Sequence, residues 1–245
     1  MKNFVVIVAC FLCYTVTAQS VQLHYDMRHW VDPKYNVKNF PVIYMEYFKN
    51  QDSGNCFIKP GSILFKMEAD LYGEQHNIGK GYMQVAQTLR MWQPKVFLHL
   101  SYSGGLGVTE PKQYSYYITN TLQVGAQYTF SWHGAILSTV LDYKYVSYSK
   151  PSNDFIYTLY WWRGLYNYRV EVAGDFSLWT ENKNHGDDYT KEMEGKRFSF
   201  FAEPQLWYNI SKRFAAGTRV TMYYHVNTWD NVWQAYPTVA VKYKL

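Results

Sequence analysis

The chain has 245 residues, of which 48% are apolar, 20% are aromatic and only 18% are charged, with a formal net charge of +5. This aromatic content excludes an intrinsically disordered chain. No apolar stretch of roughly 18 residues occurs past the N-terminus, which excludes a bundle of transmembrane helices. The positive charge is spread along the chain without a basic run, so we expect no nucleic-acid partner.

Residues 1–18 have the pattern of a secretory signal peptide. Residues 4–12 are apolar and uncharged, and Val16-Thr17-Ala18 forms a small-residue cleavage site. We therefore expect cleavage after residue 18 and one mature domain, residues 19–245. A buried N-terminal helix or strand and a lipid anchor on Cys10 are the two alternatives.

Cleavage would leave Cys56 as the single cysteine of the mature chain. An exported protein of this size without an internal disulfide needs another source of stability, and a closed β-sheet would supply it.

The mature chain alternates between apolar and polar residues with a period of two, most clearly over 62–72, 118–130 and 214–227. This period is typical of strands with one apolar and one polar face, and no segment of similar length keeps a helical period. We therefore predict an all-β fold. The twelve expected strands cover residues 20–29, 39–49, 62–72, 81–92, 95–103, 114–130, 135–147, 155–163, 166–180, 197–210, 213–227 and 232–245.

The connections between these strands alternate in length. Short turns are predicted at 93–94, 131–134, 164–165 and 211–212. Longer polar loops are predicted at 30–38, 73–80, 104–113, 148–154 and 181–196. This layout, with an even number of strands, is typical of a closed antiparallel outer-membrane β-barrel with short periplasmic turns and longer extracellular loops. The long 50–61 connection is the exception, because the layout requires a short turn there.

Pairing the strands about the short turns keeps polar residues opposite polar residues, whereas a one-residue slip would mix the two faces. The predicted opposite pairs are Thr88 with His99, Gln123 with Asp142, Tyr160 with Arg169, and Gln205 with Arg219.

The alternation alone does not decide which face points outward. In a soluble sandwich or lipocalin the apolar face would point inward, and in a membrane barrel it would face lipid. Strand lengths suited to a tilted span and the signal peptide favour the membrane barrel. Tryptophans near the expected strand ends also favour it, because interfacial aromatic belts form there. These residues are Trp30, Trp92, Trp132, Trp161, Trp162, Trp229 and Trp233.

The mature chain resembles an uncharacterised family of twelve-stranded outer-membrane proteins that is itself similar to the nucleoside-specific channel-forming (Tsx-like) porins. The motifs that carry the resemblance are 22–26 (QLHYD), 89–92 (LRMW), 203–209 (EPQLWYN) and 236–243 (YPTVAVKY). Barrels of this kind usually end on an aromatic residue, whereas this chain ends on Leu245, with Tyr243 two residues earlier on the same face.

If the apolar face meets lipid, strand parity predicts which side chains line the lumen. Charges of both signs and aromatic rings would suit a polar, ring-containing solute, and the resemblance implies nucleosides as the first candidate. The bland alternative is a set of salt bridges that merely fills a narrow lumen. The predicted solute path contains Glu68, Arg90, His99, Asp142, Lys144, Tyr160, Arg169, Glu171, Trp179, Glu203, Gln205, Trp207, Arg219 and Tyr223. Lys66, Asp70, Asp175 and Lys242 share the inward parity.

Other motifs carry little chemistry. The glycines of residues 104–107 have no helix after them to complete a phosphate site and are expected at a loop tip. The acidic residues of 181–195 lack calcium-loop spacing, so a solvated loop is favoured over a divalent-cation site. Ser138 and Ser199 have no histidine assigned to them, so we expect no enzyme.

We therefore expect a monomeric outer-membrane channel for passive diffusion, without cofactor or metal. Its expected partners are outer-membrane lipid, a small polar solute and the barrel assembly machinery. The alternative is a non-conducting barrel with a structural or loop-mediated binding role.

Overall fold

The computed structural model describes residues 19–245 apart from 51–57, 75–76, 91–94 and 110–113. The predicted signal peptide, Cys56 and Trp92 lie outside the described residues. Within the described residues the fold is all-β with one short helix, α2 (Arg28–Val31). The strands are β1 (Gln19–Asp26), β2 (Phe40–Asn50), β3 (Lys59–Asp70), β4 (Lys80–Arg90), β5 (Val96–Val108), β6 (Ser115–Trp132), β7 (Ala135–Val146), β8 (Asp154–Leu165), β9 (Val170–Asn182), β10 (Lys196–Ala202), β11 (Gln205–Asn209), β12 (Phe214–Tyr224) and β13 (Trp233–Lys244).

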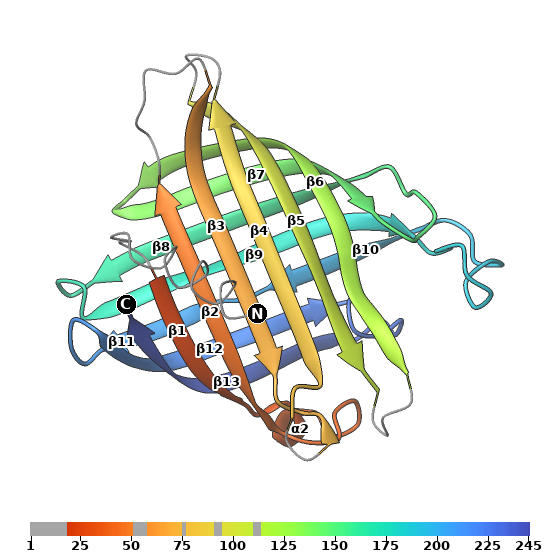
Figure 1. Ribbon diagram of the computed structural model, residues 1–245, viewed down its shortest axis with the longest axis horizontal. Coiled ribbons are helices and arrows are strands. Elements are labelled where there is room, and N and C mark those ends of the chain that lie inside the picture. Colours follow the sequence, from red (N-terminus) through yellow and green to blue (C-terminus); the bar gives the residue numbers. More distant parts are fainter. Residues whose placement is uncertain (1–18, 51–57, 75–76, 91–94, 110–113) are drawn as a thin grey trace, which may run out of the picture.

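All strand pairs are antiparallel, most of them join sequence neighbours, and β1 pairs with β13 to close the sheet into a barrel (Figure 1). Closure leaves no free sheet edge, which stabilises a chain that spans a membrane. The chain ends meet, because the Leu245 backbone N–H donates to the Gln19 carbonyl at 3.0 Å.

The strands β10 and β11 are two parts of one position in the barrel wall, which we call a stave. Both pair with β9 and with β12, and the register on each side continues unchanged across residues 203–204. Pro204 has no N–H to donate, which interrupts the ladder at this point. The barrel therefore has twelve staves, and the predicted strand 197–210 is one of them.

The connections alternate in length as predicted. Compact turns join β6 to β7 at residues 133–134, β8 to β9 at 166–169, and β11 to β12 at 210–213. The opposite end carries longer loops, including 27–39, 183–195 and 225–232. Part of the 50–61 connection belongs to the strands, because β2 reaches Asn50 and β3 begins at Lys59; its residues 51–57 lie outside the described ones.

The apolar face of the wall points outward. On β6, for example, Leu122 is 50% exposed, whereas the adjacent Thr121 is 2% exposed. On β13, Val239 and Val241 are half exposed, while Thr238 between β12 and β1 is fully buried. A soluble sandwich or lipocalin would have the opposite arrangement, so the membrane-barrel interpretation is the one that holds. Trp132 near one rim and Trp30 and Trp233 near the other are exposed, as an aromatic belt requires, whereas Trp229 in the 225–232 loop stacks on the Arg197 guanidinium.

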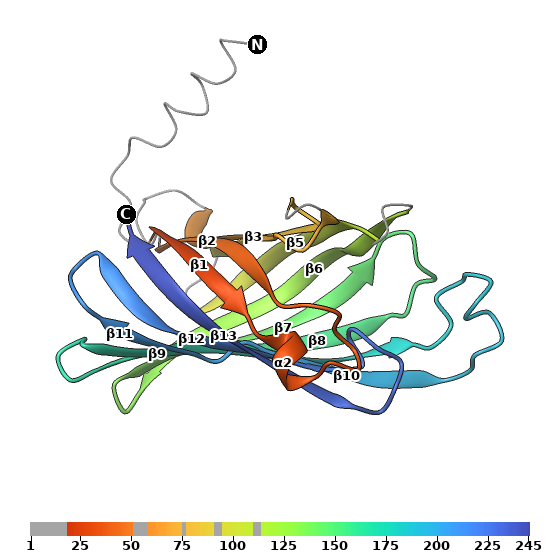
Figure 2. The same ribbon diagram turned by 90° about the horizontal axis from the view of Figure 1, so that it is seen from below.

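The barrel is flattened. Figure 2 shows β2, β3 and β5 in one wall and β9, β11 and β12 in the facing wall. Side chains of opposite walls therefore meet across the lumen, which determines the geometry of the site.

Two predicted hairpin registers are confirmed and two are wrong. Thr88 pairs with His99, and Gln205 pairs with Arg219. The predicted partner of Gln123 is wrong by two residues, because β6 and β7 join through the tight turn 133–134 and Gln123 lies opposite Lys144.

The predicted Tyr160–Arg169 pair is also wrong, because Tyr160 lies opposite Asp175. The chain turns at 166–169 and not at Gly164, which is still part of β8. A Cβ on Gly164 would lie 2.3 Å from the Tyr168 ring, so this glycine makes room for an aromatic side chain and does not form the turn.

The glycines of residues 104–107 lie in β5 and not at a loop tip, which corrects that prediction. A Cβ on Gly107 would lie 2.3 Å from the Tyr116 ring, and one on Gly104 would lie 2.4 Å from the Tyr102 hydroxyl. Here too, the glycines accommodate aromatic neighbours within the sheet.

Candidate functional site

The lumen is bridged near mid-height by an ion pair between opposite walls. The Lys66 Nζ on β3 lies 3.0 Å from the Asp175 Oδ1 on β9, and both side chains are about nine-tenths buried. In the order of the sheet, β3 and β9 are six staves apart in either direction, so this contact spans the full diameter. The Lys66 ammonium also lies 5.7 Å from the centre of the Tyr160 ring.

A second bridge lies beside the first. The Arg219 Nη2 on β12 is 2.8 Å from the Glu68 Oε2 on β3, and its Nη1 is 3.4 Å from the Glu203 Oε1. Arg219 is only 2% exposed, and its guanidinium lies 5.1 Å from the centre of the Tyr44 ring. We call Lys66, Glu68, Asp175, Glu203 and Arg219 together the septum.

Some hydrogen-bond donors of the septum have no acceptor within the part of the chain that the structure describes. The Nε and Nη1 donors of Arg219 are buried and have no hydrogen-bond acceptor among the described residues. Buried polar groups of this kind are normally satisfied by protein or by water. Two donors of the septum are thus unsatisfied in this arrangement of the described side chains.

Glu203 reaches the septum through a local irregularity of the wall. It precedes Pro204, and its backbone N–H donates to the Asp175 carbonyl at 2.8 Å. Gly174, next to Asp175 on β9, has φ +152°, and a Cβ there would lie 2.6 Å from the Glu203 carbonyl. Only glycine permits this close approach of the two strands.

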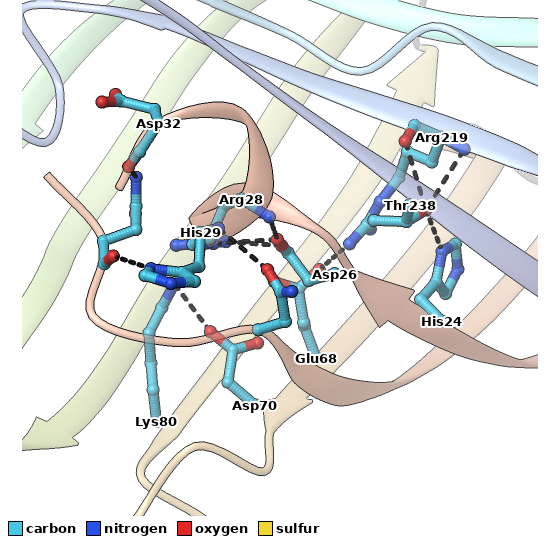
Figure 3. A network of polar contacts seen from close by, with 12 residues as sticks. His24, Asp26, Arg28, His29, Asp32, Glu68, Asp70, Lys80, Arg219 and Thr238 are labelled. Carbon is cyan, nitrogen blue, oxygen red and sulfur yellow. Dashed lines mark hydrogen bonds and ion pairs between the residues drawn. The ribbon is translucent and has the colours of Figure 1, made fainter. Parts of the chain in front are cut away.

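On the loop side of the septum, the polar contacts continue to α2 (Figure 3). The Lys80 Nζ lies 3.2 Å from the Asp70 Oδ2, and the Arg28 Nη2 lies 2.7 Å from the Asp26 Oδ2. The Arg28 guanidinium lies between two rings, 4.7 Å from the centre of Phe40 and 4.9 Å from that of Tyr236. These contacts hold the 27–39 loop at the barrel mouth.

The departure of this loop from the wall has a backbone cause. The β1–β13 pairing ends at Asp26 and Thr238, and the next residue of β13 is Pro237, which has no N–H to donate. The Met27 N–H still donates to the Pro237 carbonyl at 3.1 Å, after which the chain turns into α2.

On the side of the chain termini, the lumen is filled around Trp207, which is completely buried. Its Nε1 donates to the Gln205 Oε1 at 2.9 Å, the Lys242 Nζ lies 4.3 Å from the ring centre, and the His24 ring packs edge-on against it. Lys242 and Lys244 both pair with Glu171, at 3.1 and 2.5 Å. This end therefore carries a surplus cation.

A further buried pair lies on the β5–β7 wall, where the His99 Nδ1 is 2.7 Å from the Asp142 Oδ2. Both residues are almost completely buried, and the adjacent Ser101 hydroxyl has no hydrogen-bond partner among the described residues. Side chains so deeply enclosed are not accessible to a bulky substrate.

At the loop end, Glu181 binds two cations. Its Oε1 lies 2.6 Å from the Arg197 Nη2, and its Oε2 lies 3.2 Å from both the Lys144 Nζ and the Trp179 Nε1. The Arg197 guanidinium stacks 3.9 Å from the centre of the Trp229 ring. A cavity of about 50 Å³ beside Lys144 and Glu181 is large enough for one or two water molecules.

Glu181 belongs to β9 and not to the acidic loop, which covers residues 183–195. In that loop, hydrogen bonds from the Thr190 hydroxyl and backbone hold the pKa of Asp187 below its ordinary value. No group of three or more possible metal ligands occurs within the described ranges of the chain.

Most of the predicted path residues face the interior, and one does not. Arg169 lies exposed in the turn 166–169, so its predicted place in the lumen is wrong. Arg90 lies at the end of β4, 5.4 Å from the centre of the Phe97 ring. The structure brings together Glu68, Glu203 and Arg219 in one cluster, and places Glu171, Gln205 and Trp207 in a second.

The four aromatic residues of the predicted path differ in how much ring they present. Trp207 presents none, and Tyr223 is 9% exposed and packs against Phe201 and Tyr236. Tyr160 and Trp179 are partly exposed, each with a lysine near its ring. Their use by a solute stays a prediction.

Several residues of these clusters were not among the predicted path residues. Parity placed Lys66 and Asp175 on the inward face, but their contact depends on the flattening of the barrel. Arg28 was expected in the first strand, and Tyr44 and Arg197 were not identified. Strand parity could have identified two of them, because Tyr44 shares the inward face with Glu46, and Arg197 shares it with Ser199.

Comparison with known proteins agrees with this architecture. Residues 18–245 match the model of a protein family described as a domain of unknown function, DUF5020. The chain belongs to the DUF5020 family. No curated protein sequence matches it.

Solved barrels that are similar to this DUF5020 chain include the following three. The NanC porin superposes with a TM-score of 0.55 at 10% identity, covering 93% of this chain and 100% of NanC. The KdgM porin gives 0.48 at 8% identity, with 92% and 99% covered. LpxR from Salmonella typhimurium gives 0.46 at 8% identity, with 94% and 100% covered. At this identity the NanC match shows the fold.

None of the described helices is long and apolar enough to cross a membrane. The wall itself is apolar outside and polar inside, closed, and built with short turns at one end and long loops at the other. The DUF5020 chain is an outer-membrane β-barrel.

Proposed function

We propose that this protein is an outer-membrane channel for the passive diffusion of small polar solutes. The observation that carries the proposal is the polar lining of the lumen, which has charges of both signs from the loop end to the end where the termini meet. Such a lining replaces the water around a polar solute and does not bind cations or anions so strongly that they are retained. The twelve-stave fold, shared with NanC, is compatible with this function.

Nucleosides are the first solutes to test, because the sequence motifs resemble a family similar to the Tsx-like porins. Of the four aromatic candidates, Tyr160 and Trp179 carry this finer proposal, since both are partly exposed to the lumen. Trp207 is completely buried and could stack on a base only after its neighbours move.

Liposome swelling with the purified barrel tests both the channel function and the nucleoside preference. Xylose and uridine should enter barrel-containing liposomes faster than control liposomes. If nucleosides bind, Trp179→Leu should slow uridine more than xylose, whereas Trp132→Leu on the lipid side should change neither rate. Equal effects on both solutes would refute the nucleoside proposal and keep the channel.

The bridged lumen favours a second candidate, a non-conducting barrel. The septum joins opposite walls with buried ion pairs, and the 183–195 loop is tied to its neighbour by a hydrogen bond from the Lys150 N–H to the His185 carbonyl. A barrel of this kind would support the envelope or bind a partner through its loops. Liposomes that stay tight to xylose and to small ions would support this candidate and refute the channel.

A further inference from the structure

The septum contains more carboxylates than cations. Lys66 pairs with Asp175 and also interacts electrostatically with Glu46 and Glu203. Arg219 pairs with Glu68 and lies near Glu203. The side chains that meet at mid-lumen in the described part of the chain are thus the carboxylates of Glu46, Glu68, Asp175 and Glu203 and the cations Lys66 and Arg219.

Two neighbouring cations also interact with septum carboxylates, Lys80 with Glu68 and Lys242 with Glu46, but each has a closer partner of its own. Lys80 is paired with Asp70 towards the loops, at 3.2 Å. Lys242 is paired with Glu171, which it shares with Lys244, towards the chain termini. The surplus cation of that group lies beyond Trp207, so the negative excess and the positive excess lie at different heights.

The excess negative charge lies at the level of the lumen where side chains of opposite walls are in contact. Any solute that crosses the barrel passes between the β3 and β9 side chains or close beside them. Charges at the narrowest point of a pore act at short range and with little screening by water. The septum therefore dominates the charge preference of the whole lumen.

The septum also has the parts needed to open without leaving Lys66 unpaired. Glu46 lies directly opposite Lys66 in the β2–β3 register, on the same inward face. Its carboxylate accepts a hydrogen bond from the Tyr44 hydroxyl at 3.0 Å. Because the lysine stem is flexible, the Lys66 ammonium can move from Asp175 to Glu46, which opens the Lys66–Asp175 bridge.

We infer that the septum is a cation-selective constriction, which admits neutral and cationic solutes and repels anions. The inference rests on the proposed channel function. When Lys66 moves to Glu46, the carboxylates of Asp175 and Glu203 face the opening, and a permeating ammonium group takes the place that the Lys66 ammonium left. The Tyr160 ring, which lies near the Lys66 ammonium, would then make the same cation–π contact with the permeating cation.

The reversal potential in a planar bilayer under a potassium chloride gradient tests the inference. Wild type should prefer potassium over chloride by at least about threefold, because unlike charges attract strongly in a narrow pore. The isosteric double variant Glu46→Gln/Glu203→Gln should bring the ratio close to one. Asp188→Asn, which removes a carboxylate that is 94% exposed in the 183–195 loop, is the matched control and should keep the wild-type ratio.

The outcomes separate the inference from the function on which it rests. Conductance without cation preference in the wild type, or a preference that Asp188→Asn removes as fully as the double variant does, would overturn the inference and leave the channel. An absence of conductance in every variant would overturn the channel and the inference together. Heat-modifiable gel mobility confirms that each variant is a folded barrel before it is measured.

Discussion

Replacing Arg219 with methionine should strongly destabilise the barrel. The change keeps an unbranched apolar stem but removes the guanidinium that lies between Glu68 and Glu203, at 2.8 and 3.4 Å. Arg219 is 2% exposed, so both carboxylates would stay in a buried place with less compensation. Removing one partner of a buried ion pair costs about 3–5 kcal/mol. We expect a loss of that size in the free energy of unfolding.

Urea unfolding of the barrel in phospholipid vesicles, followed by tryptophan fluorescence, measures this loss. Arg169→Met, in the exposed turn 166–169, removes the same group and should cost less than about 0.5 kcal/mol. The triple variant Arg219→Met/Glu68→Gln/Glu203→Gln should recover most of the stability, because no unpaired charge remains. A loss below about 1 kcal/mol for Arg219→Met alone, or no recovery in the triple variant, would refute the pairing argument.

Three further changes test other parts of the structure. Gly174→Ala should cost about 1–3 kcal/mol in the same unfolding assay, because its φ of +152° and the nearby Glu203 carbonyl leave no room for a Cβ; an unchanged midpoint would contradict this. Trp207→Ala should cost about 3–5 kcal/mol, since this ring is completely buried, and an equal loss for the exposed Trp132→Ala would contradict the packing argument. Arg28→Ala should release the 27–39 loop and speed its cleavage by proteinase K on intact cells, compared with Lys34→Ala; equal rates would show that the two-ring contact does not hold the loop.

Strand parity was predictable from the sequence, because a one-residue error would place a whole apolar face on the wrong side. A register error of two residues keeps every side chain on its predicted face and leaves no trace in the pattern. The partner of Gln123 could therefore be wrong by two residues without any conflict in the pattern, whereas the Thr88–His99 pairing was right. The tight turn 133–134, with φ of +47° at His133 and +79° at Gly134, set the true register.

Glycine was the main source of the other errors. Gly164 and the glycines of 104–107 were interpreted as turn or loop residues, yet all of them lie in strands, and Gly104, Gly107 and Gly164 each lie beside a tyrosine side chain that needs the space. A sequence shows that a glycine is present but not whether its freedom or its small size is used. Consequently Arg169 was assigned to the lumen although it lies in a turn.

The septum could not be predicted from the pattern of alternation. Strand pairing predicts which residues are neighbours along the wall, such as Glu46 and Lys66. The Lys66–Asp175 contact joins staves that are as far apart as the barrel allows, and it depends on the flattened cross-section shown in Figure 2. Strand parity predicts which charges point inward but not which of them meet across the lumen.

The central claim is that the lumen is a solute path that the septum narrows at mid-height. Single-channel conductance of the wild type and of Lys66→Met/Asp175→Asn in planar bilayers tests it most directly, since the double change removes the bridge and leaves no new net charge. We expect small, discrete conductance steps in the wild type and steps at least about twofold larger in the double variant. Equal steps in both would show that the septum does not limit the path, and two ion-tight barrels would show that the lumen is not a path at all.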